Sequence, residues 1–120
     1  MQIAISATSN SIDAEIDPRF GRAAFFLLVD PATLEFEAVE NVQNLQAAQG
    51  AGIQSATLVA RHKPAAVLTG NCGPKAFQIL QAAGIPVIIG VAGSVRQAVN
   101  DFQQGKLVYA DAPNVSGHWM

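Results

Sequence analysis

A chain of 120 residues, half of them hydrophobic and 13% charged, is long enough for one domain with a single core, and this composition excludes a disordered protein. The formal net charge is −2 and no basic stripe is visible, which argues against binding to a nucleic-acid backbone. One cysteine excludes an internal disulfide and a metal cage made only of cysteines within one chain.

The first strand is predicted at residues 2–7, where "QIAIS" follows Met1 without the basic and apolar regions of a signal peptide. No apolar run approaches the roughly 20 residues that a membrane helix needs, so we expect a cytoplasmic protein. A polar segment follows at residues 9–23, and Pro18 and Gly21 interrupt regular structure there.

A hairpin is predicted next. Residues 24–30, "AFFLLVD", form a continuous apolar run of strand length, and the turn "DPAT" separates it from "TLEFEAVEN". In the second run Leu34, Phe36 and Ala38 alternate with glutamates, which is the period-2 pattern of a half-buried strand. We therefore expect the two strands to pair in antiparallel fashion.

The second half alternates helices with short apolar strands. A helix is predicted over "QGAGIQSATLVARHK" and ends before Pro64, and "AAVLT" is then a strand. Pro74 suits the first turn of a second helix, "KAFQILQAA", which Gly84 caps. After a strand in "IPVIIG", Ser94 and Gln97 form the pattern of a capping box at the start of the last helix.

The last helix shows apolar residues on one face before Gly105, at positions Val95, Ala98, Val99 and Phe102. The order of elements is thus strand, strand, strand, helix, strand, helix, strand, helix. This order predicts an α/β fold, a single α/β/α sandwich with a mixed five-stranded sheet. We assign residues 1–109 to this domain and residues 110–120 to a C-terminal tail.

A ligand site is expected where the strands end, because open α/β sheets bind ligands outside the carboxyl ends of their strands. Four turns follow strands or open helices: "SATSNS", "NLQAAQGAG", "GNCGPK" and "GVAGSV". Where such turns lead into helices, free N–H groups and the helix dipole favour an anion. Arg19, Arg22 and Lys75 add positive charge. The spacings of the Walker A and G-x-G-x-x-G loops are absent, which disfavours a nucleotide.

Cys72 has two readings that the sequence leaves open. It is a small buried residue of a tight turn, or it is a soft-metal ligand or reactive thiol, since a helix N-terminus favours the thiolate. His62 ends a helix and fits a surface residue that complements the dipole, and His118 lies in the tail. No Ser–His–Asp or Cys–His arrangement is predicted.

For the connection before the hairpin, a purely structural interpretation is also open. In "DPRFGR", Phe20 fits a core residue and the two arginines fit solvated charges. Asp13, Glu15 and Asp17 resemble a carboxylate cluster, but their alternation in a loop favours a solvated face over a site for a hard metal.

The motifs "DPRFGRAAFFLLVD", "QGAGI", "GNCGPKAFQILQAAGIPVI" and "SVRQAVNDFQQGKL" together resemble the nitrogenase iron–molybdenum cofactor carrier family, which includes NifX- and NifY-like proteins and the C-terminal part of NifB. The resemblance covers about residues 1–109. The segments "IDPRFGRAA", "GPKAFQILQAAGI" and "APNVSGHWM" are most similar to the orange-protein-like members of sulfate-reducing bacteria.

This resemblance implies a ribonuclease-H-like fold and a small carrier of a preformed metal–sulfur cluster, not an enzyme. The orange-protein-like motifs imply a molybdenum–copper sulfide cluster, and the alternative is an iron–molybdenum–sulfur or iron–sulfur precursor of the NifX type. MinD-like ATPases associated with cell division are the implied partners, and we expect a monomer. A thiol-dependent enzyme that uses Cys72 is the alternative from another class.

The family often has a histidine before "GAG", where this chain has Gln49, which argues against a histidine-ligated iron cluster. By this resemblance Cys72 is an optional soft ligand, and the backbone of the turn is the essential part. The predicted cluster-binding residues, of which Cys72 is also the candidate metal ligand, are Arg19, Phe20, Gly21, Arg22, Gly50, Gly52, Gly70, Asn71, Cys72, Gly73, Pro74, Lys75, Gly93 and Ser94.

Overall fold

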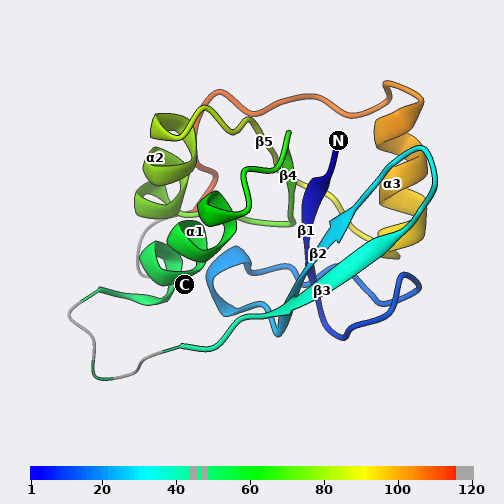
Figure 1. Cartoon of the computed structure of the whole chain (residues 1–120). Coiled ribbons are helices and arrows are strands. Elements are labelled where there is room, and N and C mark those ends of the chain that lie inside the picture. The colour runs from blue at the N-terminus through cyan, green and yellow to red at the C-terminus, as the bar shows by residue number, and fades with distance from the viewer. Residues whose placement is uncertain (44–45, 47–48, 116–120) are drawn as a thin grey trace.

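The computed structural model describes residues 1–43, 46 and 49–115, and their elements follow the predicted order (Figure 1). A short 3-10 helix lies inside the first connection, residues 8–24, between the first two strands. The elements are β1 Ile3–Ala7, η1 Phe20–Arg22, β2 Phe25–Val29, β3 Phe36–Glu40, α1 Ala51–Arg61, β4 Val67–Leu68, α2 Pro74–Ala82, β5 Val87–Ile88 and α3 Val95–Gln103.

The five strands form one mixed sheet in the order β3-β2-β1-β4-β5. β2 is antiparallel to β1 and β3, whereas β4 is parallel to both β1 and β5. β1, β3, β4 and β5 therefore all end on the same side of the molecule, which we call the carboxyl end of the sheet. The three helices of the described part each begin at this end, because each follows one of these strands.

The sheet lies between two helical layers, so the predicted α/β/α sandwich with a mixed five-stranded sheet is confirmed (Figure 1). The alternation of side chains along β1 and β2 divides the core. Ile3, Ile5 and Leu27 face α3, and Ala4 and Phe26 face α1 and α2. In the described residues no helix combines the length and the apolar character that crossing a membrane requires.

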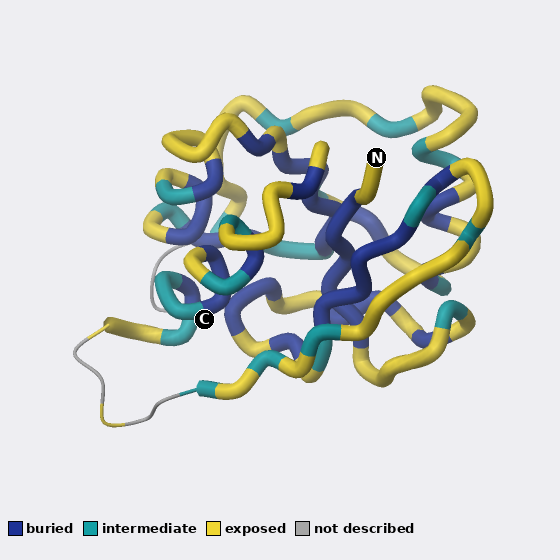
Figure 2. Tube along the Cα trace, viewed as in Figure 1, coloured by how far each residue is buried: buried dark blue, intermediate teal, exposed yellow. Residues whose placement is uncertain are grey.

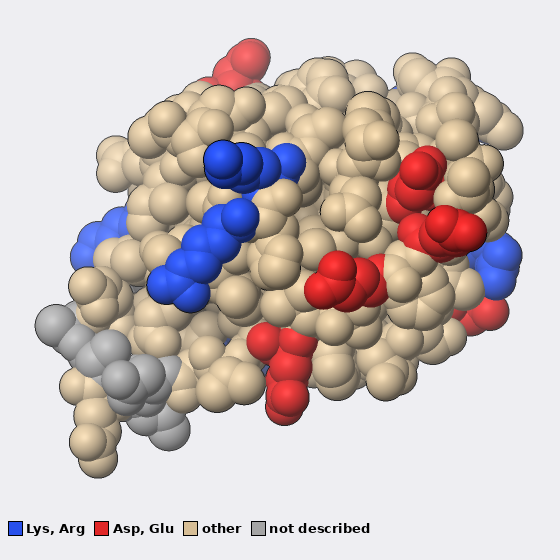
Figure 3. Space-filling view, in the orientation of Figure 1, with Lys and Arg blue, Asp and Glu red and all other residues tan. Residues whose placement is uncertain are grey.

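The pairing of β3 with β2 is as predicted, but its burial is not. The period-2 pattern predicted a half-buried strand, yet Phe36 is 39% exposed and Ala38 is exposed as well. The reason is the strand order, since β3 is the last strand of the sheet and shows exposed residues along its length (Figure 2). Acidic side chains gather over this hairpin in Figure 3, and Glu35, Glu37 and Glu40 are exposed there.

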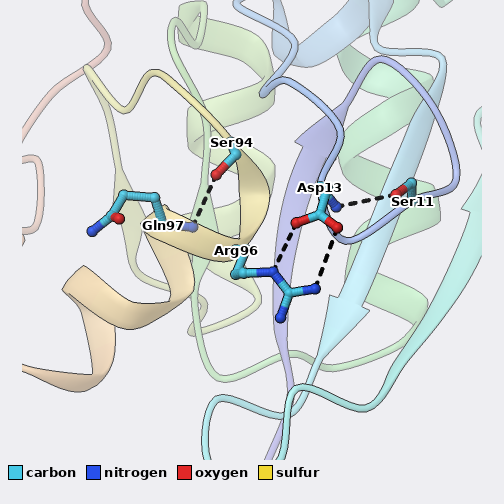
Figure 4. Close-up of polar contacts among 5 residues, drawn as sticks. All are labelled: Ser11, Asp13, Ser94, Arg96 and Gln97. Atoms are coloured by element: carbon cyan, nitrogen blue, oxygen red, sulfur yellow. Dashed lines mark hydrogen bonds and ion pairs between the residues drawn. The ribbon is translucent and has the colours of Figure 1, made fainter.

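The helix ends follow their local sequence signals. Gly84 and Gly105 take φ values of 75° and 72° after α2 and α3, as the capping prediction requires. The capping box of α3 forms only in part (Figure 4). The hydroxyl of Ser94 accepts a hydrogen bond from the N–H of Gln97 at 3.1 Å, but the Gln97 side chain turns to Asp101.

Candidate functional site

The first connection, residues 8–24, is the segment on which the other loops of the carboxyl end converge. Segments that are far apart in the sequence each bond to a different part of it. The carbonyl of Gly93 accepts from the Ile16 N–H at 2.8 Å, and the carbonyl of Asn71 accepts from the Phe20 N–H at 3.1 Å. The hydroxyl of Ser55, in α1, donates to the Gly21 carbonyl at 3.0 Å. The predicted turns that hold Asn71 and Gly93 therefore meet the first connection at one end of the sheet, as α1 does, whereas residues 44–45 and 47–48 of the predicted turn before α1 lie outside the described residues.

Two glycines permit this convergence because backbone approaches backbone there. A Cβ on Gly70 would lie 2.8 Å from the Cα of Pro18, and a Cβ on Gly21 would lie 3.0 Å from the Cα of Gly52. Neither neighbour is a flexible side-chain end that can move away. Gly21, Gly52 and Gly70 were predicted to contact a ligand, and the structure gives each of them a packing role.

Buried polar groups fix the middle of the same connection. The Ser6 hydroxyl donates to the Asp17 carbonyl at 2.8 Å and lies 2.8 Å from the Thr69 hydroxyl. Asp17 is 8% exposed, and its carboxylate accepts from the Arg19 N–H at 3.1 Å. The prediction of a solvated face is therefore wrong for Asp17, because its side chain satisfies the backbone of the turn.

Asp13 does not join Asp17 in a carboxylate cluster, because it forms an ion pair with Arg96 of α3. The guanidinium of Arg96 approaches the Asp13 carboxylate at 2.7 Å and lowers the pKa of that carboxyl through the hydrogen bond (Figure 4). The same helix start carries Gly93 and Ser94, so these predicted site residues lie beside the first connection. Among the described residues, no group of three or more His, Cys, Asp or Glu side chains could hold a metal ion.

Cys72 is a core residue in this structure. It is 0% exposed and packs in the same cluster as Phe20, Ala76 and Phe77. Burial raises its pKa to about 12, so the prediction of a favoured thiolate is wrong, because desolvation disfavours the charged form. A thiol-dependent enzyme needs the opposite shift. The alternative reading of Cys72 as a small buried residue is confirmed.

Positive charge does reach the surface at this end. Arg19, Arg22 and Lys75 are exposed, on the first connection, on η1 and in the first turn of α2. Within the described part of the chain the ion pair between Arg96 and Asp13 is the only one, so these three cations pair with no described carboxylate. Of the exposed glutamates of the hairpin, Glu37 and Glu40 lie on β3, at the edge of the sheet, and Glu35 lies just before it.

The starts of α1 and α2 differ from the start of α3. Gly50 and Gly73 are their N-cap residues and have no side chain with which to accept from the first turn, whereas Ser94 caps α3. Pro74 occupies the first turn of α2, as predicted. Two helix N-termini therefore present their positive ends at the carboxyl end of the sheet without a side-chain cap.

The remaining predicted residues separate into surface and interior. Asn71 is partly exposed and its side chain donates to the Pro18 carbonyl at 2.7 Å. Phe20 is fully buried with its ring centroid 5.0 Å from that of Phe26, which confirms the core reading. His62 is the exposed C-cap residue of α1, and His118 lies outside the described residues.

One residue at this end was not among the predicted set. The Asn114 side chain accepts from the Cys72 N–H at 2.9 Å and donates to the Asn71 side chain at 2.9 Å. The only signal for it was the segment "APN" in the tail, since no local pattern predicts a contact over 42 residues.

Comparison with known proteins identifies relatives along most of the chain. The family model described as dinitrogenase iron-molybdenum cofactor matches residues 1–105. The apo form of the orange protein from Desulfovibrio gigas is 45% identical, with a TM-score of 0.88 over 95% of this chain and 96% of that one.

Two relatives of lower identity are also similar over most of the chain. A Thermotoga protein described as NifB is 25% identical, with a TM-score of 0.77 over 95% of this chain and 97% of that chain. An uncharacterized protein of Methanocaldococcus jannaschii is 30% identical over 109 residues, which are 89% of each chain.

Replacing Gly70 with alanine tests the close approach to Pro18. We expect Gly70→Ala to lower the free energy of unfolding by about 1–3 kcal/mol, because the added methyl group meets backbone at 2.8 Å. Gly50→Ala is the matched control, since a Cβ there meets nothing within 4 Å, and we expect a change within about 0.5 kcal/mol. Urea denaturation measures both, and equal losses would contradict the packing role of Gly70.

The raised pKa of Cys72 predicts a pH dependence of stability. The thiol ionises near 9.0 when unfolded and near 12 when folded, so above pH 9 the unfolded state binds fewer protons and stability falls as pH rises. At pH 10.5 the wild type should have lost about 2 kcal/mol more than Cys72→Ala, relative to pH 8. Denaturation at the two pH values measures this difference, and parallel losses in both proteins would show that the thiol is not buried.

Proposed function

The chain belongs to the dinitrogenase iron-molybdenum cofactor family, and on that premise we propose that it is a non-enzymatic carrier of a preformed, anionic metal–sulfur cluster. The observation that carries the proposal is the carboxyl end of the sheet. There two helix N-termini without side-chain caps lie beside the exposed cations Arg19, Arg22 and Lys75.

This arrangement suits a soft anion better than a bare metal ion. A metal ion needs several side-chain ligands, and the described residues offer no group of three. A cluster that brings its own sulfides needs hydrogen-bond donors and positive charge around it, since its metals are already coordinated. The backbone N–H groups at the starts of α1 and α2 and the three cations supply these.

We assign different roles to the residues of the site. Arg19, Arg22 and Lys75 neutralise the charge of the cluster, and the first turns of α1 and α2 donate N–H groups to it. Phe20 and Gly21 are buried and hold the first connection in place without touching the ligand. Cys72 adds a bond to a metal of the cluster only in a state in which its thiol is uncovered.

We propose a molybdenum–copper sulfide cluster as the cargo. This choice is supported by the 45% identity to the orange protein over nearly the whole of both chains. An iron–molybdenum–sulfur precursor of the NifX type is the alternative. Gln49 at the position before "GAG" favours the first choice, because an amide is a poorer ligand for iron than the histidine of many relatives. MinD-like ATPases remain the partners that the family resemblance suggests, and the carrier acts as a monomer.

Reconstitution tests the proposal and the role of the cations together. Apo-protein mixed with tetrathiomolybdate and Cu(I) should acquire intense visible absorption that stays with the protein on gel filtration. We expect Arg19→Gln combined with Lys75→Gln to weaken binding of this probe about threefold to tenfold, because two exposed charges are lost from the site.

The control is Arg61→Gln combined with Lys63→Gln, which removes the same charge from the far end of α1. This variant should bind like the wild type. Equal weakening in both double variants would show that net charge alone attracts the probe, and an unchanged spectrum of the reagents would contradict the carrier.

The composition of the cargo is tested on native protein. Elemental analysis of protein purified from its source should find molybdenum and copper together, with iron absent, and should give the same metals for Cys72→Ala. Iron with molybdenum would favour the precursor of the NifX type. Loss of all metal in Cys72→Ala would contradict a site made chiefly of backbone donors and cations.

A further inference from the structure

The chain after α3 returns to the site. It runs from α3 across the sheet to the side of α2, as the orange and red segment in Figure 1 shows. Two contacts fix its described end. The N–H of Ala110 donates to the carbonyl of Val87 at 2.8 Å, on the outer edge of β5, and Ala110 packs against the core cluster that contains Cys72.

Asn114 then binds both sides of the turn that holds the thiol. Its side-chain oxygen accepts from the Cys72 N–H at 2.9 Å, and its own N–H donates to the Cys72 carbonyl at 3.2 Å. Its amide nitrogen donates to the Asn71 side chain at 2.9 Å. The segment from Ala110 to Asn114 is thus held at one end on β5 and at the other end on the turn.

We propose that residues 110–115 are a displaceable latch: an anionic ligand replaces the Asn114 oxygen on the Cys72 N–H, and opening of the latch uncovers the Cys72 thiol. This inference deepens the proposed function, because it states how that same site changes when the cluster binds. It also explains how a fully buried thiol can sit in a turn that faces a ligand.

The hydrogen bonds of Asn114 are ones that an anionic ligand can replace. Its oxygen is a neutral acceptor, and an anion accepts the same N–H in a shorter and stronger hydrogen bond. Asn114 is exposed, so water replaces its bonds readily when it leaves. Hydrogen bonds hold the segment that carries it, Ala110 packs on the core cluster and Val115 is partly buried, whereas the large, fully buried apolar residues of the core lie elsewhere.

Opening of the latch would also reach the first connection. Asn71 donates to the Pro18 carbonyl at 2.7 Å and accepts from Asn114, so the two amides link the tail to the first connection in series. When Asn114 leaves, the Asn71 side-chain oxygen loses the hydrogen bond from Asn114, while the backbone of Asn71 still bridges that of Arg19 in the first connection. The latch therefore links the tail to the first connection.

Thiol reactivity tests the latch without any cargo. We expect Asn114→Ala to raise the rate of alkylation of Cys72 by iodoacetamide at pH 8 about tenfold, because two side-chain hydrogen bonds that close the latch are lost. Ala110→Pro should raise the rate as well, since it removes the N–H bond at the other end of the latch. Asn100→Ala, an exposed asparagine on α3, is the matched control and should react like the wild type.

Far-UV circular dichroism and the urea midpoint of each variant establish that alkylation is measured on folded protein. Rates for both latch variants within twofold of the wild type would overturn the proposal, because another part of the fold would then cover the thiol.

Binding of tetrathiomolybdate with Cu(I) tests the displacement. Asn114→Ala should bind this probe at least threefold more tightly than the wild type, because the ligand no longer competes with the Asn114 oxygen. Weaker binding by Asn114→Ala would mean that the tail is a fixed wall of the site, and would overturn the proposal. If the wild type and the variant both fail to bind the probe, the proposed carrier function fails, and the alkylation rates still decide whether the latch exists.

Discussion

The site depends on one close contact between two stretches of backbone, Pro18 in the first connection and Gly70 after β4. Only a residue without a Cβ lets the chains approach so closely, and the contact brings the first connection over the end of β4. The hydrogen bonds of Asn71 to Pro18 and Phe20 depend on this approach. From there the connection reaches α1 through a second close approach, of Gly21 to Gly52, so the two contacts together position both uncapped helix starts against one loop.

This constraint explains why a small sheet can present several donors at one end. β4 and β5 are only two residues long, and the chain beyond them turns at once into loops that bond to each other, as Gly90 does to the Gly70 carbonyl. The strands lead the chain to the carboxyl end of the sheet, and the first connection is the segment to which the loops bond there. Exposed glutamates lie on the outermost strand, and Arg19 and Lys75 lie on segments that adjoin the turn.

The sequence predicted best what is decided locally. The order of elements, the glycines that end α2 and α3, and the serine cap of α3 depend on neighbours within a few residues, and they are confirmed. The burial of Phe36 and Asp17 was predicted wrongly, and that of Cys72 was left open, because strand order and the packing of distant segments decide their burial. Asn114 escaped prediction for the same reason, since it acts on a turn 42 residues away.

The burial of Cys72 has a consequence for how a carrier holds its cargo. A cage of thiolates binds soft metals tightly, and release then requires breaking metal–sulfur bonds. Amide donors and exposed cations hold an anion by contacts that water and salt weaken, so cargo held in this way can be passed on. In the proposed latch, a single thiol that is covered when the site is empty would avoid reaction in the apo state, and it would add one soft bond once an anion has displaced Asn114. On that proposal the tail, and not the number of cysteines, governs retention and release.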